Sequence, residues 1–361
     1  MIWTPFKMVP KKFLGIDIGT SAIKLVEISR WQERRKLENY GEMPTVALYE
    51  KPFRTFGKST LLLSSQDISK AILAILNEAK IKTRQVVFSI PDFSSFFTNF
   101  GLPSMTKEEL SEAVMFEARQ HVPLPLIEVT LDWQVIEGKI PEGKISNQKK
   151  TDLKILLIAV PNEVINQYQV IAQLCKLKLF ALEAEVFGLI RSLIREEEGG
   201  VVVLVDIGAQ STTCNIIENR ILKRSYSLDV SANELTKLIS KGLNIDYREA
   251  EGLKRKYGLT TSERKIREIL LPLIDLILIE IDKISKNFYQ QESKEVQKII
   301  LAGGQALLPG LKEYFESHLK KEIEIANPFS NLLYPPILEN TLKEIGPSYA
   351  IAVGMALRGL E

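Results

Sequence analysis

Two segments far apart in the chain share one pattern of apolar and polar residues. FLGIDIGTSAIKLVEIS begins at Phe13, and VVLVDIGAQSTTCNIIE begins at Val202. Each is an apolar run, then Asp-Ile-Gly, a small polar turn and a second apolar run. This pattern predicts a β-hairpin, because glycine permits the turn and β-branched residues favour the flanking strands. The repeat predicts a duplicated chain whose halves each contain such a hairpin.

The residues between the hairpins predict helices and strands by their apolar spacing. In chain order, the pattern predicts a helix over 66–78, a strand at 86–90, a helix over 110–121, and strands at 129–135 and 155–160. Thr106 and Glu109 form a capping-box pattern ahead of the second helix. We interpret residues 91–162 as a compact insert, followed by a helix over 163–177 and a further segment, 179–195.

The second half predicts a block of helices between its hairpin and a late buried strand. Helices are expected over 232–241, 247–257 and 266–289, then a strand at 296–301, a helix that begins near Pro309, and a C-terminal helix over 348–358. We assign residues 13–90 and 163–198 to a first lobe, which carries the insert 91–162. We assign residues 199–230 and 296–361 to a second lobe, which carries the helical block 231–295.

Length, composition and charge bound the class of protein. A chain of 361 residues with 45% hydrophobic and 25% charged residues fits two packed domains. Lysine and arginine number 47 against 45 aspartate and glutamate, so the charge does not favour a nucleic-acid partner. Cys175 and Cys214 lack the spacing of metal or redox motifs, and we interpret them as reduced packing residues.

No segment predicts secretion or membrane insertion. Pro5 and Pro10 interrupt the N-terminal segment, which lacks the apolar core of a signal peptide. The most apolar stretch, 269–281, contains Pro272 and Asp275 and is shorter than the roughly 20 residues of a spanning helix. We expect a cytoplasmic protein that reaches a membrane only through a partner.

The two Asp-Ile-Gly turns carry the clearest chemistry. Facing one another, they would place backbone N–H groups around phosphates. Asp17 and Asp206 would supply hard oxygen ligands, directly or through water, for a phosphate-bound Mg²⁺, and Lys24 could pair with a phosphate oxygen. Each turn alone is a weak signal, because Asp and Gly are ordinary turn residues. The pair predicts a triphosphate site.

A third glycine-containing turn adds to this pattern. Gly303 and Gly304 lie between a predicted buried strand and a helix, where the backbone can approach a flat ligand that a Cβ would repel. By itself this motif is also weak. The motifs become specific through their order along the chain. That order is hairpin turn, small-residue helix, hairpin turn, helical block, Gly-Gly turn and small-residue helix.

In this order the motifs resemble the nucleotide site of the superfamily of actin, the heat-shock chaperone ATPases and the sugar kinases. The phosphate motifs correspond to Gly15–Lys24 and Leu204–Thr213, the connecting helices to Glu183–Leu193 and Ser348–Arg358, and the adenosine motif to Leu301–Gly310. The resemblance implies an α/β, actin-like (ribonuclease H-like) fold whose two lobes hold ATP or ADP with Mg²⁺ between them.

The position of the insert resembles one branch of that superfamily, which contains the division protein FtsA and the type IV pilus assembly protein PilM. Four segments resemble the PilM family in particular: 89–133, 249–254, 327–329 and 352–358. In the terms of that branch, the insert is subdomain 1C, the rest of the first lobe is 1A, the second lobe is 2A, and its helical block is 2B.

The resemblance also implies roles for single residues. Glu185 matches the carboxylate that positions the attacking water, with Glu183 as the alternative. Glu251 and Lys254 match the residues beside ribose and adenine, although such a pair is also typical of an exposed helix face. Gln210 stands where a small residue is usual, so at most a slow Mg²⁺-dependent ATPase is expected. The implied nucleotide-binding residues are Asp17, Gly19, Thr20, Ser21, Lys24, Asp206, Gly208, Ala209, Gln210, Ser211, Glu251, Lys254, Gly303, Gly304 and Gln305, with Asp17 and Asp206 toward the metal.

A PilM-like protein would act by binding a partner rather than by rapid catalysis. The resemblance implies capture of the N-terminal cytoplasmic peptide of a PilN-like inner-membrane protein, in the groove between the first lobe and its insert. Phe93, Phe96, Phe97 and Phe100 could supply apolar contacts there, or could be core residues of the insert. Self-association stays open.

Three other functions share the fold. An FtsA-like division protein would carry a C-terminal amphipathic helix, whereas this sequence ends at Leu360 and Glu361 without one. A sugar-kinase-type phosphotransferase would need a further catalytic aspartate, for which no separate motif is found. A cytoplasmic scaffold of type II secretion is not separated from PilM by the sequence.

Overall fold

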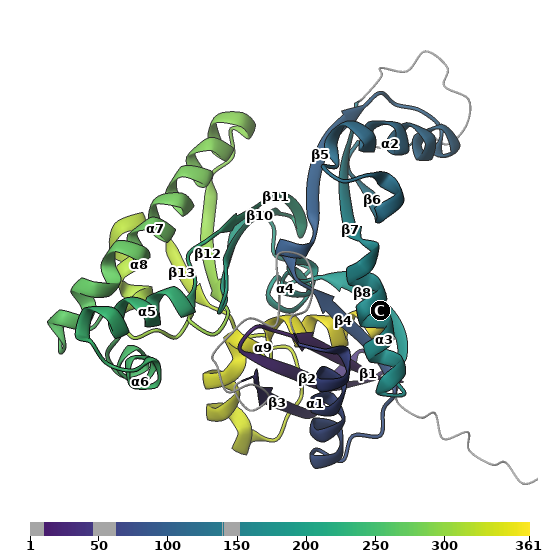
Figure 1. Ribbon diagram of the computed structural model, residues 1–361. Helices are drawn as coiled ribbons and strands as arrows, with labels where there is room; N and C mark the ends of the chain where they lie inside the picture. Colours follow the sequence, from purple (N-terminus) through teal and green to yellow (C-terminus); the bar gives the residue numbers. More distant parts are fainter. Residues whose placement is uncertain (1–10, 46–62, 139, 141–151) are drawn as a thin grey trace, which may run out of the picture.

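Two sheets of the same strand order form the framework of the protein (Figure 1). The computed structural model describes residues 11–45, 63–138, 140 and 152–361. The first sheet has the order β3-β2-β1-β4-β8 and the second β11-β10-β9-β12-β13, so that β1 corresponds to β9 and each neighbour to its counterpart. The shared order confirms the duplication. Each sheet and the helices that cover it form one lobe.

The first sheet is built on the predicted hairpin. Its strands are β1 (Lys11–Ile18), β2 (Ala22–Trp31), β3 (Arg34–Pro44), β4 (Gln85–Ile90) and β8 (Lys178–Ala184), and its covering helices are α1 (Ser65–Glu78) and α3 (Asn162–Leu174). β1 pairs antiparallel with β2 and parallel with β4. Apolar residues of these strands and of both helices share one core, in which the rings of Tyr168 and Phe88 meet edge to face.

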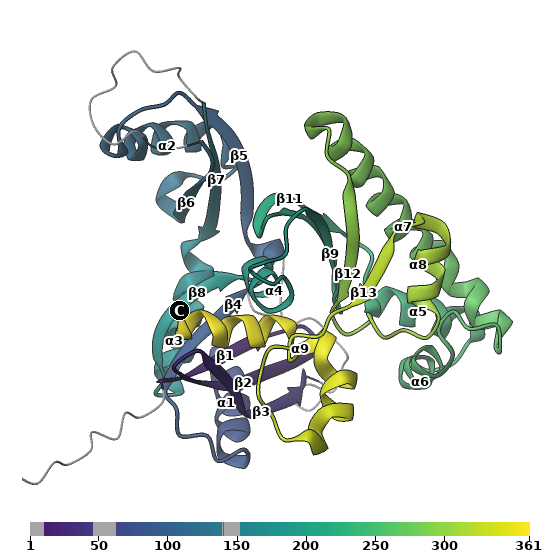
Figure 2. The same cartoon turned by 180° about the vertical axis from the view of Figure 1, so that it is seen from behind.

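The insert is a small unit of its own between β4 and α3. It contains η2 (Asp92–Ser94), β5 (Phe96–Leu102), α2 (Lys107–His121), η3 (Leu126–Glu128), β6 (Val129–Glu137) and β7 (Leu153–Pro161). The strands pair in the order β5-β7-β6, and α2 buries Leu110, Val114 and Ala118 against them. Thr106 and Glu109 form the predicted capping box. The insert projects away from the first sheet (Figures 1 and 2).

The aromatic segment at the start of the insert joins three separate cores. Phe93 packs against the core of the first lobe, and Phe97 against the core between the lobes. Phe96 and Phe100 pack against the core of the insert, and the ring of Phe100 stacks on His121 with 5.0 Å between centroids. All four phenylalanines are partly buried, so this segment is part of the framework that holds the insert in place.

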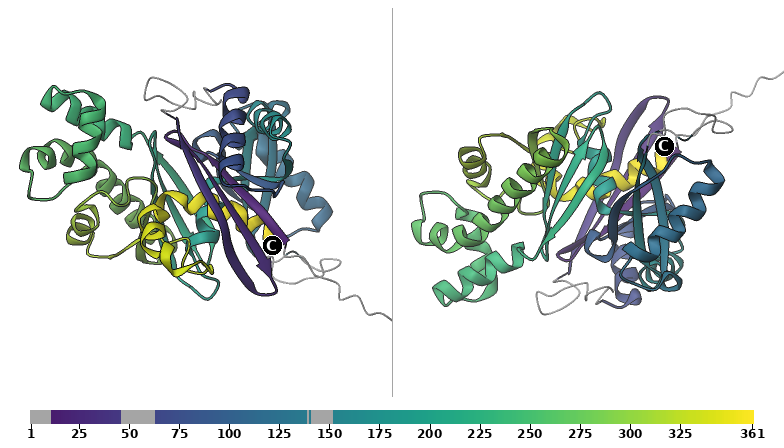
Figure 3. Two further views of the ribbon diagram at one scale, coloured as in Figure 1. Left: turned by 90° about the horizontal axis from the view of Figure 1, so that it is seen from below. Right: turned by 90° about the horizontal axis from the view of Figure 1, so that it is seen from above.

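The second lobe repeats the first sheet and adds a layer of helices. Its strands are β9 (Val201–Ile207), β10 (Thr212–Glu218), β11 (Ile221–Leu228), β12 (Val296–Ala302) and β13 (Glu322–Ile325), and its helices are α5 (Ala232–Leu243), α6 (Tyr247–Tyr257), α7 (Arg264–Glu292) and α8 (Leu311–Leu319). Figure 3 shows these helices on the face of the second sheet that points away from the first lobe. Cys175 and Cys214 are buried and unpaired, as predicted.

Polar contacts tie the insert to the second lobe. Lys154 of β7 lies 3.1 Å from Glu292 at the end of α7. Lys223 of β11 forms an ion pair with Glu137 of β6. The side-chain amide of Asn99 in β5 donates to the backbone carbonyl of Lys223 at 2.6 Å. The insert therefore contacts both lobes.

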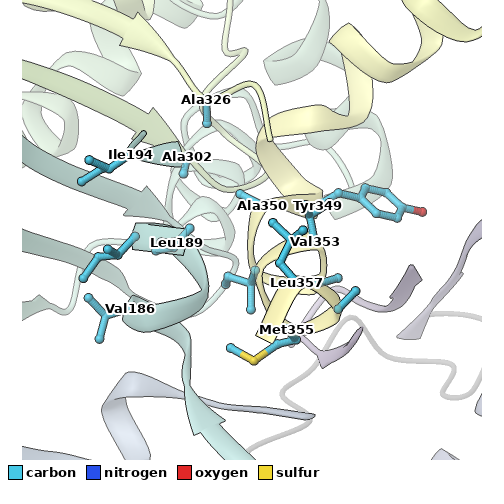
Figure 4. Packing of buried hydrophobic residues seen from close by; sticks show 14 of the residues in the cluster. Val186, Leu189, Ile194, Ala302, Ala326, Tyr349, Ala350, Val353, Met355 and Leu357 are labelled. Atoms are coloured by element: carbon cyan, nitrogen blue, oxygen red, sulfur yellow. The ribbon is translucent and has the colours of Figure 1, made fainter. Parts of the chain in front are cut away.

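Two helices connect the lobes and lie between the sheets (Figure 3). These are α4 (Glu185–Leu193) and α9 (Glu339–Leu360), the latter preceded by η4 (Pro336–Leu338). They cross at Gly188 and Gly354: a Cβ atom at Gly354 would lie 2.0 Å from the carbonyl oxygen of Gly188. Figure 4 shows Met355 on the side of α9 that faces α4. A Cβ atom at Gly188 would lie 2.7 Å from the Cε atom of Met355. The close crossing depends on the absence of side chains at both glycines.

The placement of α9 corrects one part of the sequence prediction. Chain order groups 296–361 with the second lobe, but α9 packs mainly on β1, β2, β4 and α4. Gly15 of β1 permits this, because a Cβ atom there would lie 2.0 Å from the backbone oxygen of Ala352. The helix also begins earlier than the predicted residue 348 and contains Pro347 in its interior.

Candidate functional site

A cleft of about 760 Å³ lies between the two lobes. The two hairpin turns, the start of α4, the helices α5 and α6, and the loop after β12 form its walls. Every residue that the sequence assigns to the nucleotide site lines this one cleft, including Glu185. Residues from the two halves of the chain therefore meet as the duplication predicts.

The two turns have the same backbone geometry. Gly19 N–H donates to the carbonyl of Ala22 at 3.1 Å, and Gly208 N–H donates to the carbonyl of Ser211 at 3.0 Å. The turns also contact each other, since the Thr20 hydroxyl lies 3.5 Å from the side-chain oxygen of Gln210. Gln210, the departure from the usual turn sequence, therefore reaches across the cleft toward the first lobe.

The residues facing each aspartate differ between the lobes. Asp17 lies opposite Lys24 in the hairpin register, whereas Asp206 lies opposite Thr213. Lys24 is buried and lines the cleft. Of the two residues that lie opposite the aspartates, only Lys24 is basic, and it belongs to the first lobe. A phosphate group between the turns would therefore meet the charge of Lys24 on that side.

Both aspartates lie in surroundings that disfavour their charge. Burial raises the pKa of Asp17, while Lys24 and the Ser89 hydroxyl, which donates to Asp17 at 2.8 Å, act in the opposite direction. Burial and the nearby charge of Asp17 raise the pKa of Asp206 to about 6. A divalent cation between the two carboxylates would relieve this repulsion.

The two aspartates do not make a complete metal centre by themselves. In the described part of the chain, no three His, Cys, Asp or Glu side chains are grouped so as to hold a metal ion. Mg²⁺ usually keeps several waters and takes one or two protein carboxylates together with phosphate oxygens. Asp17 and Asp206 therefore fit a nucleotide-bound Mg²⁺ better than a resident structural ion.

The structure separates the two candidate glutamates at the start of α4. Glu185, the first residue of α4, lines the cleft. Glu183, on β8, is held by Arg191 at 2.5 Å and lies 3.5 Å from Arg358. Glu185 is thus the one that can reach a ligand in the cleft. Burial and the neighbouring carboxylates Asp92, Asp17 and Asp206, in that order, raise the pKa of Glu185 well above its ordinary value.

Glu251, which is partly buried, and Lys254, which is fully buried, form an ion pair on the side of the cleft made by the helical block. Lys254 is only 1% exposed and lies 2.7 Å from Glu251. It also donates to the Thr236 hydroxyl at 2.8 Å and to the Ala232 carbonyl at 3.0 Å. Burial alone would raise the pKa of Glu251, but Lys254, Thr236 and Arg255 together lower it. An exposed helix-surface pair is therefore excluded.

The Gly-Gly loop after β12 is shaped by its glycines. Gly303 has φ +86°, and a Cβ atom there would lie 2.4 Å from the carboxylate of Asp206. A Cβ at Gly304 would meet nothing within 4 Å, so the backbone is open at that residue. Gly303 N–H donates to the carbonyl of Pro347 at 2.9 Å, which fixes the loop against α9. The loop offers a flat backbone wall to a planar ligand.

Several cleft residues are absent from the set of nucleotide-binding residues that the resemblance implies, although Ile207, Thr213, Ser348 and Ile351 lie inside its motif segments. They are Pro44, Thr45, Phe93, Ile207, Thr213, Ala232, Asn233, Tyr247, Arg248, Arg255, Ser348 and Ile351. Tyr247 and Arg248 begin α6, and the Tyr247 hydroxyl donates to the side-chain oxygen of Asn233 at 2.8 Å. The helix N-terminus at Tyr247 was a usable signal, because polar groups at that end of a helix suit anionic ligands. Pro44, Phe93 and Ala232 lie outside the nucleotide-site motifs and carry no comparable signal.

Among the helices of the described residues, none is both long enough and apolar enough to cross a lipid bilayer.

Two lobes of one strand order, with a cleft between their hairpin turns, define an actin-like ATPase fold. MreB 5 of Spiroplasma citri, solved with AMPPNP, has this fold: it is 14% identical, with a TM-score of 0.51 over 96% of this chain and 95% of its own. More specifically, the chain belongs to the family of the type IV pilus assembly protein PilM, which matches residues 15–360.

Two individual relatives are similar over most of the chain. The chain is similar to the protein solved as the PilM-PilN type IV pilus biogenesis complex, with 27% identity and a TM-score of 0.83 over 96% of this chain and 98% of that one. The cell division protein FtsA of Bacillus subtilis (strain 168) is 22% identical over 359 residues, which cover 88% of this chain and 78% of FtsA.

Proposed function

We propose that the protein is an ATP-binding component of a type IV pilus assembly platform and that it captures the N-terminal cytoplasmic tail of a PilN-like inner-membrane protein. The observation that carries the proposal is the likeness, over nearly the whole chain, to the protein solved with PilN. A protein of this kind would lie in the cytoplasm and reach the membrane through that tail.

Nucleotide binding is supported by the fit of the cleft to a Mg²⁺-nucleotide. The turn amides and Lys24 would contact phosphates, Asp17 and Asp206 would face the metal, and the open backbone at Gly304 would face the base. Glu251 and Lys254 would lie beside the ribose and adenine. The bound metal would neutralise phosphate charge and fix the orientation of the phosphates.

Slow hydrolysis is the most that we propose for this site. Glu185 would accept a proton from water as the water oxygen bonds to the γ-phosphorus and the bond from that phosphorus to the β–γ bridging oxygen breaks. Burial and the neighbouring carboxylates Asp92, Asp17 and Asp206 raise the pKa of Glu185, which disfavours the charged form that acts as a base. Hydrolysis at this site is therefore expected to be slow.

The edge where the insert meets the first lobe offers an apolar contact for the tail. Ile127 of η3 is 87% exposed. Its position is fixed, because the Asn162 side chain at the start of α3 donates to the Ile127 carbonyl at 2.9 Å, and Thr130 donates to Asn162 at 2.8 Å. An extended peptide that buries such residues would bind with micromolar affinity, about −8 kcal/mol.

Ile127→Glu is expected to weaken tail binding by about tenfold or more, because it places a charge where the peptide would bury apolar surface. Ile337→Glu is the matched control: Ile337 is 89% exposed, but it lies in η4 beside α9 rather than in the insert. The measurement is fluorescence titration of a labelled PilN-like tail into wild type and both variants.

Equal losses in the two variants would place the tail elsewhere or reveal a nonspecific effect of charge. Absence of any binding to wild type would remove the partner proposal. If the tail-free protein then associates with lipid vesicles by itself, an FtsA-like role would be favoured instead.

A further inference from the structure

The segments that carry Asp92 and Glu185 are joined by two reciprocal hydrogen bonds. Asp92 N–H donates to the carboxylate of Glu185 at 3.2 Å. In return, Val186 N–H donates to the carboxylate oxygen Oδ1 of Asp92 at 3.2 Å. The N-cap residue of α4, Ala184, has no side-chain acceptor, so Asp92 takes the place of a cap. The rotamer of Glu185 and the first turn of α4 are held by the same residue.

Asp92 is buried more completely than this capping role requires. It is 5% exposed, and among the described residues its second carboxylate oxygen, Oδ2, has no hydrogen-bond partner. Burying an unpaired polar atom costs free energy. Burial raises the pKa of Asp92 to about 7, with Asp206 contributing, so Asp92 feels the charges of the cleft. The cost of burying this oxygen favours a role for Asp92 beyond capping α4.

Asp92 also lies at the root of the insert. It is the first residue of η2, which connects β4 of the first lobe to β5 of the insert. Three residues earlier, Ser89 of β4 donates to Asp17 at 2.8 Å. The stretch from Ser89 to Asp92 therefore touches the aspartate of the first turn at one end and Glu185 at the other, and then continues into the insert.

We propose that Asp92 is a positioning residue that orients Glu185 toward the attacking water and links that orientation to the position of the insert. The inference rests on the proposed function and deepens it: a tail bound at the insert shifts η2, and the reciprocal bonds transmit the shift to Glu185. Asp92 does not itself exchange a proton with the nucleotide or the water. Partner capture then sets the rate of ATP turnover.

Asp92→Ala tests the link, because alanine keeps the backbone bond to Glu185 but removes the acceptor for Val186. Single-turnover hydrolysis is expected to fall by about tenfold or more, while the Kd for Mg²⁺-ATP changes by less than about threefold. The tail is expected to lose its effect on turnover. Asp92→Asn keeps an oxygen acceptor and should restore turnover to within about threefold of wild type. Asp132→Asn, an exposed position on β6, is the matched control and should behave as wild type.

Further measurements separate this inference from its alternatives. In a Glu185→Gln background, Asp92→Ala should cause no additional loss of turnover, because Asp92 acts through Glu185. If Asp92→Ala does not fold, Asp92→Ser, with a shorter acceptor, takes its place. Wild type that binds no Mg²⁺-ATP would refute the proposed function itself. Three outcomes would each overturn the positioning role. In the first, wild type binds Mg²⁺-ATP but never hydrolyses it; in the second, Asp92→Ala keeps wild-type turnover and response to the tail. In the third, Asp92→Ala and Asp92→Asn lose turnover equally.

Discussion

Gly354→Ala is expected to destabilise the protein by about 3 kcal/mol or more. The added Cβ would lie 2.0 Å from the carbonyl oxygen, 2.4 Å from the carbonyl carbon and 2.5 Å from the Cα of Gly188. All three are backbone atoms, so no side-chain rotation can relieve the clash, and α4 and α9 must move apart. Because these helices join the lobes, the cleft would also be displaced. Denaturant unfolding measures the loss of stability.

Gly252→Ala is the matched control for that substitution. Gly252 is also inside a helix, α6, but a Cβ there would meet nothing within 4 Å. Alanine is favoured over glycine in a helix by roughly 0.5–1 kcal/mol, so this variant should be slightly more stable than wild type. Similar stabilities for the Gly354 and Gly252 variants would contradict the close helix crossing.

Asp206→Asn is expected to have opposite effects on stability and on binding. It should weaken Mg²⁺-ATP binding by about 100-fold, or ~3 kcal/mol, because a neutral amide replaces a carboxylate that faces the metal. In the nucleotide-free protein it removes a charge that burial and Asp17 oppose. The variant should therefore be more stable than wild type at pH 8 by up to about 3 kcal/mol.

The pH dependence of stability shows that the Asp206 charge destabilises the nucleotide-free protein. The pKa of Asp206 is raised from 3.8 to about 6 in the folded protein, so the folded state binds the proton more tightly than the unfolded chain. Its contribution to stability is present below pH 3.8 and is lost as the pH rises through about 6. The stability gained in Asp206→Asn should thus grow between pH 4 and pH 7 and then level off.

Thermal unfolding across pH, with and without Mg²⁺-ATP, and calorimetric titration measure both effects. Asp229→Asn, at an exposed position just after β11, is the control and should change neither. An Asp206→Asn protein that still gains wild-type stability from Mg²⁺-ATP would show that Asp206 does not face the metal.

Two of the strands that the sequence did not predict show where apolar patterns fail. β3 and β11 are the third strands of the two sheets and lie at their edges. Arg34–Pro44 and Ile221–Leu228 carry many polar residues, and most of their side chains are only partly buried. Edge strands need no continuous apolar run, because their side chains are less completely covered than those of central strands. Pairing with the central hairpin, rather than local pattern, makes these segments strands.

The two candidate glutamates show a different limit. Glu183 and Glu185 are two residues apart, and alignment by motif cannot choose between them. The chain changes from β8 to α4 between them, at Ala184. Glu183 therefore stays on the strand beside Arg191, whereas Glu185 turns with the helix into the cleft. The direction of each side chain depends on where the strand ends.

The sequence by itself determined the duplication, the two Asp-Ile-Gly turns and the insert, because glycine turns, apolar runs and helix caps act over a few residues. Many of the residues that line the cleft followed from the order of the motifs and its resemblance to a known nucleotide site. Only the tertiary structure decided that α9 belongs with the first sheet, that Glu185 rather than Glu183 lies in the cleft, and that Asp92 at the root of the insert bonds to the start of α4. These features depend on where β8 ends and α4 begins, and on contacts between parts of the chain that are distant in sequence. Local patterns of residue types do not record either of them.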